Sequence, residues 1–138
     1  CGTLITPALA EAQVHGGMSM AIGYGLSEEL KFDEKTGKPL NNNLLDYKLS
    51  TFMDHPTLQA AFVENPEPTS PYGTKALGEP PACSPAPAIR SAIYNATGVS
   101  IDDDSLAILN ATGVAFDACP ITPHVLYRGF KEAGLIED

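Results

Sequence analysis

The sequence predicts a single mixed α/β domain over residues 1–138, in which a long glycine-rich helix and further helices pack on a small mixed sheet. Two observations predict this fold class. Apolar side chains recur every three to five positions through residues 7–30, as on one face of a helix. Short alternating stretches typical of strands then separate this segment from later segments that begin at prolines and end at glycines, as helices do.

The first predicted helix, residues 7–30, begins at Pro7, which suits the first helical turn, with Thr6 as its cap. Four glycines interrupt it: Gly16, Gly17, Gly23 and Gly25. Each costs about 1 kcal/mol relative to alanine in a helix interior. Close packing against a neighbouring element explains such glycines, and so does a large flat ligand lying on the helix. We favour packing.

Strand-like segments follow. Residues 28–33 alternate enough for a short strand, and Gly37 can take the left-handed conformation of the turn after it. Residues 41–49 form a return strand or an irregular crossing, and residues 59–64 (QAAFVE) and 115–119 read as further strands. These segments supply the predicted sheet.

Two later helices carry clear boundary signals. Residues 85–97 open on prolines and end at Gly98, and residues 123–132 follow a Thr122 cap and end near Gly134. The pentapeptide NATGV occurs at 95–99 and again at 110–114, and the acidic stretch SIDDDSLAIL between the two copies starts another predicted helix.

Composition excludes several classes of function. Eight Lys and Arg against 17 Asp and Glu give a net charge of −9, which argues against binding to nucleic acid or to an anionic membrane. No stretch approaches the ~20 apolar residues of a membrane-spanning helix, and no signal-peptide pattern opens the chain. The three scattered cysteines form neither a disulfide framework nor a zinc ligand set, so we expect a cytoplasmic protein. Its start, Cys-Gly-Thr, reads as a piece of a longer polypeptide or a processed subunit.

The stretch YGTKALGEPPACSPA contains the main candidate for chemistry. Its one acidic residue, Glu79, lies between Gly78 and Pro80–Pro81. Prolines fix φ and remove backbone donors, and the residue before a proline is pushed towards extended conformations. We therefore expect Glu79 on a stiff, non-helical turn, where its carboxylate direction is set as a general base requires. The alternative is an exposed loop glutamate.

Two polar residues of the first predicted helix are further candidates. The amide of Gln13 offers donors and an acceptor suited to a pterin or a phosphate, although a solvent-facing glutamine is the commoner case. His15 has no second histidine or cysteine at ligand spacing, so we expect no protein-held metal and place His15 at a surface or an interface.

Four stretches, in this order, resemble the C-terminal part of the molybdopterin-binding large subunit of the xanthine dehydrogenase and aldehyde oxidoreductase family. They are ITPALAEAQVHGGMSM at 5–20, LNNNLLDY at 40–47, KALGEPP at 75–81 and ATGVAFDACPITP at 111–123. The resemblance implies that residues 1–138 are one segment of a molybdenum-cofactor-binding domain. It also implies a molybdenum hydroxylase that oxidises an N-heterocycle or an aldehyde.

The same resemblance assigns roles to individual residues. Glu79 matches the glutamate that takes a proton from the metal-bound hydroxide, while the metal itself is held by a pterin rather than by side chains. Further positions match contacts to the pterin or its dinucleotide: Thr6, Ala10, Gln13, Lys75, Ala76, Leu77 and Gly78. The cofactor is either the pterin alone or its cytosine dinucleotide form, and the bacterial character of the sequence favours the dinucleotide. Iron–sulfur clusters and a flavin would lie on other domains or subunits.

The sequence also departs from the family pattern. Thr6 replaces the usual asparagine, and residues 100–114 add a segment that we expect on the surface, away from the metal. The family's glycine-rich cofactor loops and substrate-orienting arginines have no counterpart here, since Arg90 and Arg128 both lie on predicted helices past the site. We therefore expect the isolated chain to be inactive and to need the rest of the subunit.

Two other functions stay open on the sequence alone. One is a non-catalytic assembly domain that docks on a cofactor-bearing partner. The other, an unrelated small enzyme using His15 or His124, has no nucleophile motif behind it.

Overall fold

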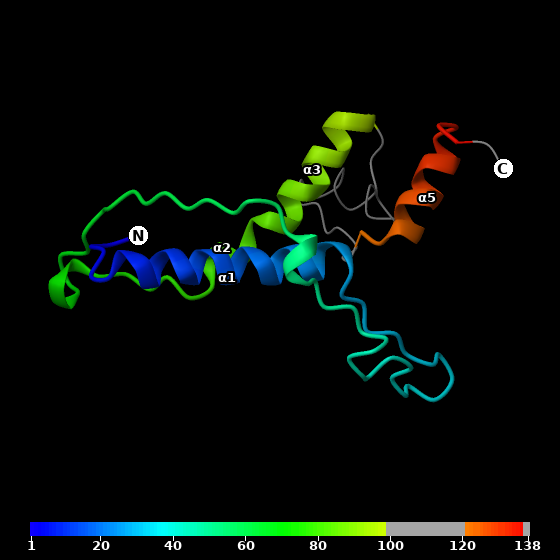
Figure 1. Cartoon of the computed structure of the whole chain (residues 1–138), viewed down its shortest axis with the longest axis horizontal. Helices are drawn as coiled ribbons and strands as arrows, with labels where there is room; N and C mark the ends of the chain where they lie inside the picture. Colours follow the sequence, from blue (N-terminus) through cyan, green and yellow to red (C-terminus); the bar gives the residue numbers. More distant parts are fainter. Residues whose placement is uncertain (99–120, 137–138) are drawn as a thin grey trace.

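The computed structural model describes residues 1–98 and 121–136. Its axis is the helix α1 (Pro7–Leu26), which forms a long rod (Figure 1). The other elements, in chain order, are the short 3-10 helices η1 (Phe52–Asp54) and η2 (Pro71–Gly73), and the helices α2 (Pro80–Cys83), α3 (Pro85–Thr97) and α5 (Pro123–Glu132). The regular secondary structure of the described residues is therefore helical.

The predicted α/β fold with a small mixed sheet is wrong for the described residues. Residues 1–98 and 121–136 contain no strand, and their β pairing is limited to one antiparallel bridge between Phe32 and Pro39. Alternation predicts an extended backbone, but a sheet also needs a second strand beside it. Residues 59–64 are not helical, as expected, yet no described strand pairs with them. The strand expected at 115–119 and the helix expected from residue 100 lie outside the described residues.

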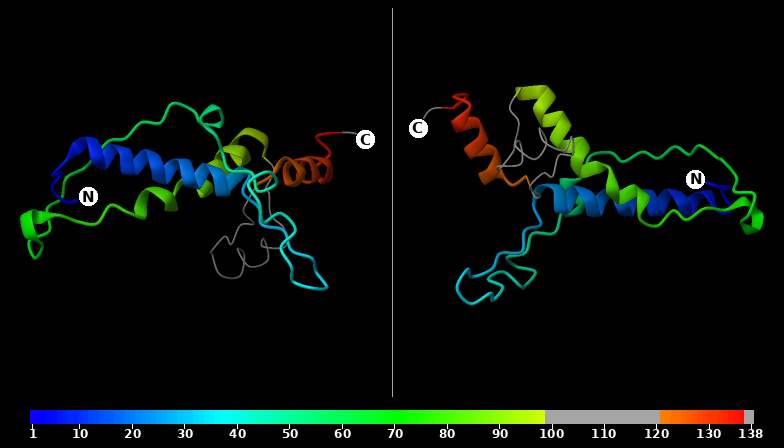
Figure 2. Two further views of the ribbon diagram at one scale, coloured as in Figure 1. Left: turned by 60° about the horizontal axis from the view of Figure 1, so that its bottom comes forward. Right: turned by 180° about the vertical axis from the view of Figure 1, so that it is seen from behind.

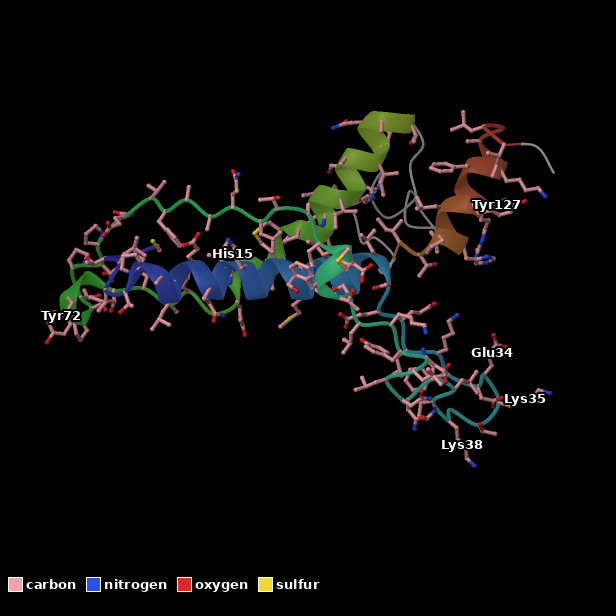
Figure 3. All side chains as sticks on the ribbon, in the orientation of Figure 1. His15, Glu34, Lys35, Lys38, Tyr72 and Tyr127 are labelled. Carbon is pink, nitrogen blue, oxygen red and sulfur yellow. The ribbon has the colours of Figure 1, made fainter. Side chains whose placement is uncertain are left out.

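Residues 28–49 form a projecting arm instead of two paired strands (Figure 2). The buried side chain of Asn41 holds the base of the arm, because its Oδ1 accepts from the Lys31 backbone at 2.7 Å and its Nδ2 donates to the Glu29 carbonyl at 2.6 Å. These side-chain bonds add to two backbone bonds across the arm, from the Leu40 amide to the Lys31 carbonyl at 2.8 Å and from the Asp33 amide to the Lys38 carbonyl at 2.9 Å. Figure 3 shows Glu34, Lys35 and Lys38 at the far tip of the arm.

The first helix is shorter than predicted, ending at Leu26 rather than at residue 30. The backbone amides of Ser27 and Glu28 both donate to the Gly23 carbonyl at 2.9 Å, which closes the last turn. At the other end Thr6 occupies the cap position, but its side chain makes no cap hydrogen bond. Its carbonyl accepts from the backbone amides of Leu9 and Ala10 at 3.1 Å.

Helices α2 and α3 pack on α1 through its glycines. A Cβ added at Gly17 would lie 2.7 Å from the Cβ of Pro81 in α2, a distance that requires one of the two helices to move. A Cβ at Gly25 would lie 3.4 Å from the Cβ of Ala86 in α3. Close packing, the favoured interpretation of the glycines, is therefore confirmed for Gly17 and Gly25, whereas a Cβ at Gly16 would meet nothing within 4 Å.

The predicted later helices are confirmed. Helix α3 ends at Gly98 with φ of 71°, the left-handed conformation that glycine adopts without strain. Helix α5 begins after Thr122, whose hydroxyl accepts from the Val125 amide at 3.5 Å. The backbone amide of Ile121 donates to the Gly25 carbonyl at 2.7 Å and so connects this segment to α1.

The interior of the described chain is small. Its buried apolar side chains are Ala21, Ala86 and Ile121, and no large side chain is fully buried among the described residues. Many large apolar side chains lie in solvent, and the most exposed include Phe52, Tyr72, Met53 and Val63. None of the described helices is long and apolar enough to cross a membrane.

Candidate functional site

A groove of about 550 Å³ lies between α1 and the turn that leads into α2. Residues far apart in the sequence line it, because α2 packs against the middle of α1. Three sequence-predicted site residues, Gln13, Gly78 and Glu79, line this one groove. The volume falls in the range of roughly 300–1,000 Å³ that is usual for small-molecule sites.

Glu79 is exposed and immediately precedes α2. The prediction of a non-helical conformation is wrong, because its φ of −87° and ψ of −35° are helical. The Ala82 amide donates to the Glu79 carbonyl at 2.9 Å, so Glu79 begins the first turn of α2. Packing of α2 on Gly17 favours this conformation over the extended one that a following proline prefers.

Gln13 connects the helix to the turn. Its Nε2 donates to the Gly78 carbonyl at 3.0 Å, across 65 positions of sequence. This bond holds the residue next to Glu79 against the face of α1. Gln13 is exposed, as a solvent-facing glutamine would be, but its side-chain amide also makes this specific hydrogen bond to Gly78.

Two glycines of the groove are not explained by packing within the described chain. A Cβ built on Gly16 or on Gly78 would have no neighbour within 4 Å. Both residues line the groove. Because glycine has no side chain, a bound group can approach the backbone at these two positions of the groove.

The other predicted contact residues lie outside this groove. Leu77 faces a separate hollow of about 220 Å³ that Val14 and Phe62 also line. Lys75 and Ala76 lie on the non-helical segment before the turn, and neither lines these two hollows. Thr6 and Ala10 lie at the start of α1, also outside both hollows.

Six residues that line the groove were not predicted as site residues, and Gly16, Met20 and Tyr24 are the three among them at regular steps along α1; the others are Gly17, Ala82 and Cys83. Three of them follow Gln13 at steps of three or four along α1, so helical periodicity could have found them. The hydroxyl of Tyr24 donates to the Ala82 carbonyl at 2.5 Å and ties the end of the groove to α2.

Among the side chains that line the groove, the carboxylate of Glu79 is the one acidic group, and no lysine or arginine accompanies it. The described residues contain no group of three or more His, Cys, Asp or Glu side chains arranged to hold a metal ion. Arg90 lies on α3 and Arg128 on α5, past the groove in the sequence, as predicted. Such a site can place one proton acceptor beside a bound, largely uncharged molecule.

Carboxylates with perturbed pKa values lie elsewhere. Hydrogen bonds from the side chain and backbone of Thr69 lower the pKa of Glu67, and the backbone and hydroxyl of Thr51 lower that of Asp54. Tyr47 has a raised pKa because its hydroxyl donates to Glu28 at 2.9 Å. These groups stabilise turns or the base of the arm and lie outside the groove.

Comparison with known proteins identifies related sequences. Residues 1–56 match the model of the molybdopterin cofactor-binding domain family. Over 135 residues the chain is 49% identical to the putative xanthine dehydrogenase molybdenum-binding subunit XdhA of Escherichia coli (strain K12), covering 98% of this chain and 16% of that protein. It is 35% identical to the aldehyde oxidoreductase molybdenum-binding subunit PaoC of the same organism, covering 74% of this chain and 14% of PaoC.

A solved structure contains a segment with a similar backbone arrangement. The Cu,Mo-CO dehydrogenase, in its carbon monoxide reduced state, matches with a TM-score of 0.77 and 29% identity, over 99% of this chain and 16% of that one. The chain thus spans about a sixth of the length of these relatives.

Proposed function

This chain belongs to the xanthine dehydrogenase family of molybdenum oxidoreductases, within the molybdopterin-binding large subunit, and we propose that it forms one wall of the cofactor cleft and supplies Glu79 as the general base. The observation that carries the proposal is the single groove that Gln13, Gly78 and Glu79 share. A carboxylate in an otherwise uncharged groove can act as a general base when the proton it accepts lies within hydrogen-bond reach.

The groove residues fit a pterin. Gly16 and Gly78 carry no side chain where they line the groove, so a flat ring system could approach the backbone at these two positions. Gln13 presents an amide at the same place, a group that pairs with the donors and acceptors of a pterin edge. Gly78 and Gln13 would contact the group directly, while Thr6, Ala10, Lys75, Ala76 and Leu77 would complete the binding surface together with the rest of the subunit.

The molybdenum–pterin group, when bound, supplies the centre that accepts electrons from the substrate. Glu79 accepts the proton that the attacking oxygen must lose as it bonds to an electron-poor carbon. The hydrogen bond from Gln13 to Gly78 keeps the backbone next to Glu79 in place during this transfer. A positioned general base typically contributes about 10²–10⁴-fold to the rate.

We take the substrate class, the partners and the cofactor of the complete enzyme from the family. The substrate would be an N-heterocycle, as xanthine dehydrogenases use, or an aldehyde. The partners would be the rest of the large subunit and domains or subunits that carry iron–sulfur clusters and a flavin. The cofactor would be molybdopterin, in its simple or cytosine dinucleotide form.

Replacing Glu79 by Gln in the complete enzyme tests the proposal. We expect turnover to fall by about 10²-fold or more, because the amide cannot accept the proton, while molybdenum and pterin contents stay at the wild-type level. Glu34→Gln, the same change at the tip of the arm, is the matched control and should leave turnover unchanged. If Glu79→Gln also leaves turnover unchanged, the chain acts as a non-catalytic assembly domain instead.

A further inference from the structure

Tyr24 connects α1 to α2 on the far side of Glu79 from the Gln13 bond. Its hydroxyl donates to the Ala82 carbonyl at 2.5 Å, across 58 positions of sequence. Ala82 is the third residue after Glu79, whereas the Gly78 carbonyl that accepts from Gln13 comes immediately before it. Two side chains of one helix therefore hold the backbone on both sides of Glu79.

Ala82 relays the contact from Tyr24 to Glu79 through the backbone. The Ala82 amide donates to the Glu79 carbonyl at 2.9 Å, and the carbonyl of the same residue accepts from Tyr24. The direction of the Glu79 carboxylate depends on the first turn of α2, which this amide bond closes. A displacement of that turn would therefore stretch the bond to Tyr24.

Helix α2 needs such an anchor because it is a single turn of four residues. An isolated turn is unstable in water, since one hydrogen bond does not offset the entropy of fixing several dihedral angles. The amides that would extend it are also missing in part, because Pro85 and Pro87 have no amide hydrogen to give to the carbonyls four positions before them. Contacts with α1 must hold the turn, and the hydroxyl of Tyr24 supplies one of them.

Tyr24 lines the same groove as Glu79 and is half-buried there. A phenol has one hydrogen to donate, and Tyr24 donates it to a backbone carbonyl. The hydroxyl is therefore not placed to give a proton to a bound molecule. Its position in the groove wall suits a residue that fixes another group rather than one that reacts.

We propose that Tyr24 is a positioning residue, which acts through Ala82 to fix the turn that carries the carboxylate of Glu79. The inference rests on the proposed function of Glu79 as the general base. A base must lie within hydrogen-bond reach of the proton that it accepts, so a small displacement slows the transfer. Substrate binding does not depend on that reach. Loss of the Tyr24 hydroxyl should thus lower kcat and leave KM unchanged.

Tyr24→Phe in the complete, cofactor-loaded enzyme removes the hydroxyl and keeps the ring. We expect kcat to fall by about 2–12-fold, the rate equivalent of one hydrogen bond, with KM and the molybdenum and pterin contents at wild-type levels. Tyr94→Phe removes the same group from an exposed tyrosine on α3, outside the groove, and should have wild-type kinetics. A normal kcat in Tyr24→Phe, a change in KM alone or a loss of cofactor would each refute the positioning role.

Combination with Glu79→Gln decides whether Tyr24 acts through the base. In the Glu79→Gln background we expect Tyr24→Phe to have no further effect on the residual turnover, because the group that it positions no longer accepts a proton. An equal loss in both backgrounds would show that Tyr24 acts independently of Glu79, which overturns this inference and leaves the proposed function intact. Normal turnover in Glu79→Gln alone would overturn the proposed function and this inference with it.

Discussion

The side chain of Gln13 donates a hydrogen bond of 3.0 Å to the carbonyl of Gly78, the residue that precedes Glu79. This contact links the middle of α1 to the turn that carries the candidate base. It joins two stretches that are far apart in the sequence and that each contain candidate site residues. It also provides a direct way to test whether the position of the turn matters for activity.

Removal of the hydrogen bond between Gln13 and Gly78 should lower the turnover rate without loss of the bound cofactor. In the complete enzyme, Gln13→Ala loses one hydrogen bond, worth about 0.5–1.5 kcal/mol. We expect kcat to fall by roughly 2–12-fold, the rate equivalent of that energy, with molybdenum content retained. Gln59→Ala, at another exposed glutamine, is the control and should match the wild type. A normal kcat in Gln13→Ala would show that the bond does not position Glu79.

Adjacent glycines of α1 should respond differently to the same substitution. Gly17→Ala places a Cβ 2.7 Å from Pro81 and 3.2 Å from the Ala82 nitrogen, so α2 must move. We expect a loss of stability of about 1–3 kcal/mol, seen as a lower melting temperature of the complete subunit. Equal melting temperatures of this variant and the wild type would contradict the packing of α2 on α1.

Gly16→Ala meets no atom of the described chain and should not destabilise it. If a planar cofactor lies along the groove, however, the added methyl group obstructs it. We expect a lower pterin content in the purified enzyme, measured after oxidation to the fluorescent pterin derivative. A full pterin content in Gly16→Ala would place the cofactor away from this face of α1.

The turn at the arm tip should have a measurable pH response. Asp33 accepts from the hydroxyl and the amide of Thr36, and also from the amide of Lys35, and these bonds hold its pKa below the usual value of 3.8. A depressed pKa means that the turn is stabilised above pH 3.8 and loses that stabilisation as the pH falls through the lowered pKa. In Thr36→Val the pKa of Asp33 should rise towards 3.8, as followed by carbon NMR of labelled aspartate. An unchanged pKa would exclude the hydroxyl as its main cause.

The isolated 138-residue chain should neither hold molybdenum nor turn over substrate. It supplies one wall of the proposed cleft, and many of its large apolar side chains lie in solvent. Metal analysis combined with an assay against xanthine and an aromatic aldehyde measures both properties. Stoichiometric molybdenum with turnover would refute this expectation and the assignment of the chain to one wall.

The helices were predictable because their signals are local. Pro7, Pro85 and Pro123 open α1, α3 and α5, and Gly98 and Gly134 adopt left-handed φ of 71° after the last two. Helical hydrogen bonds join residues four apart, so the nearby sequence contains most of the information that determines where a helix begins and ends. Glu79 is a candidate base for an equally local reason, since it is the one acidic residue of a stretch rich in glycine and proline.

Other features depend on contacts between distant residues. The sequence alone indicated extended segments and one carboxylate on a proline-rich turn. The tertiary structure decided that residues 28–49 form an arm rather than paired strands, that Glu79 is helical, and that Gln13, Gly78 and Glu79 share a groove. The physical reason is that strand pairing and helix packing require partners far along the chain, and the partner determines which local preference prevails.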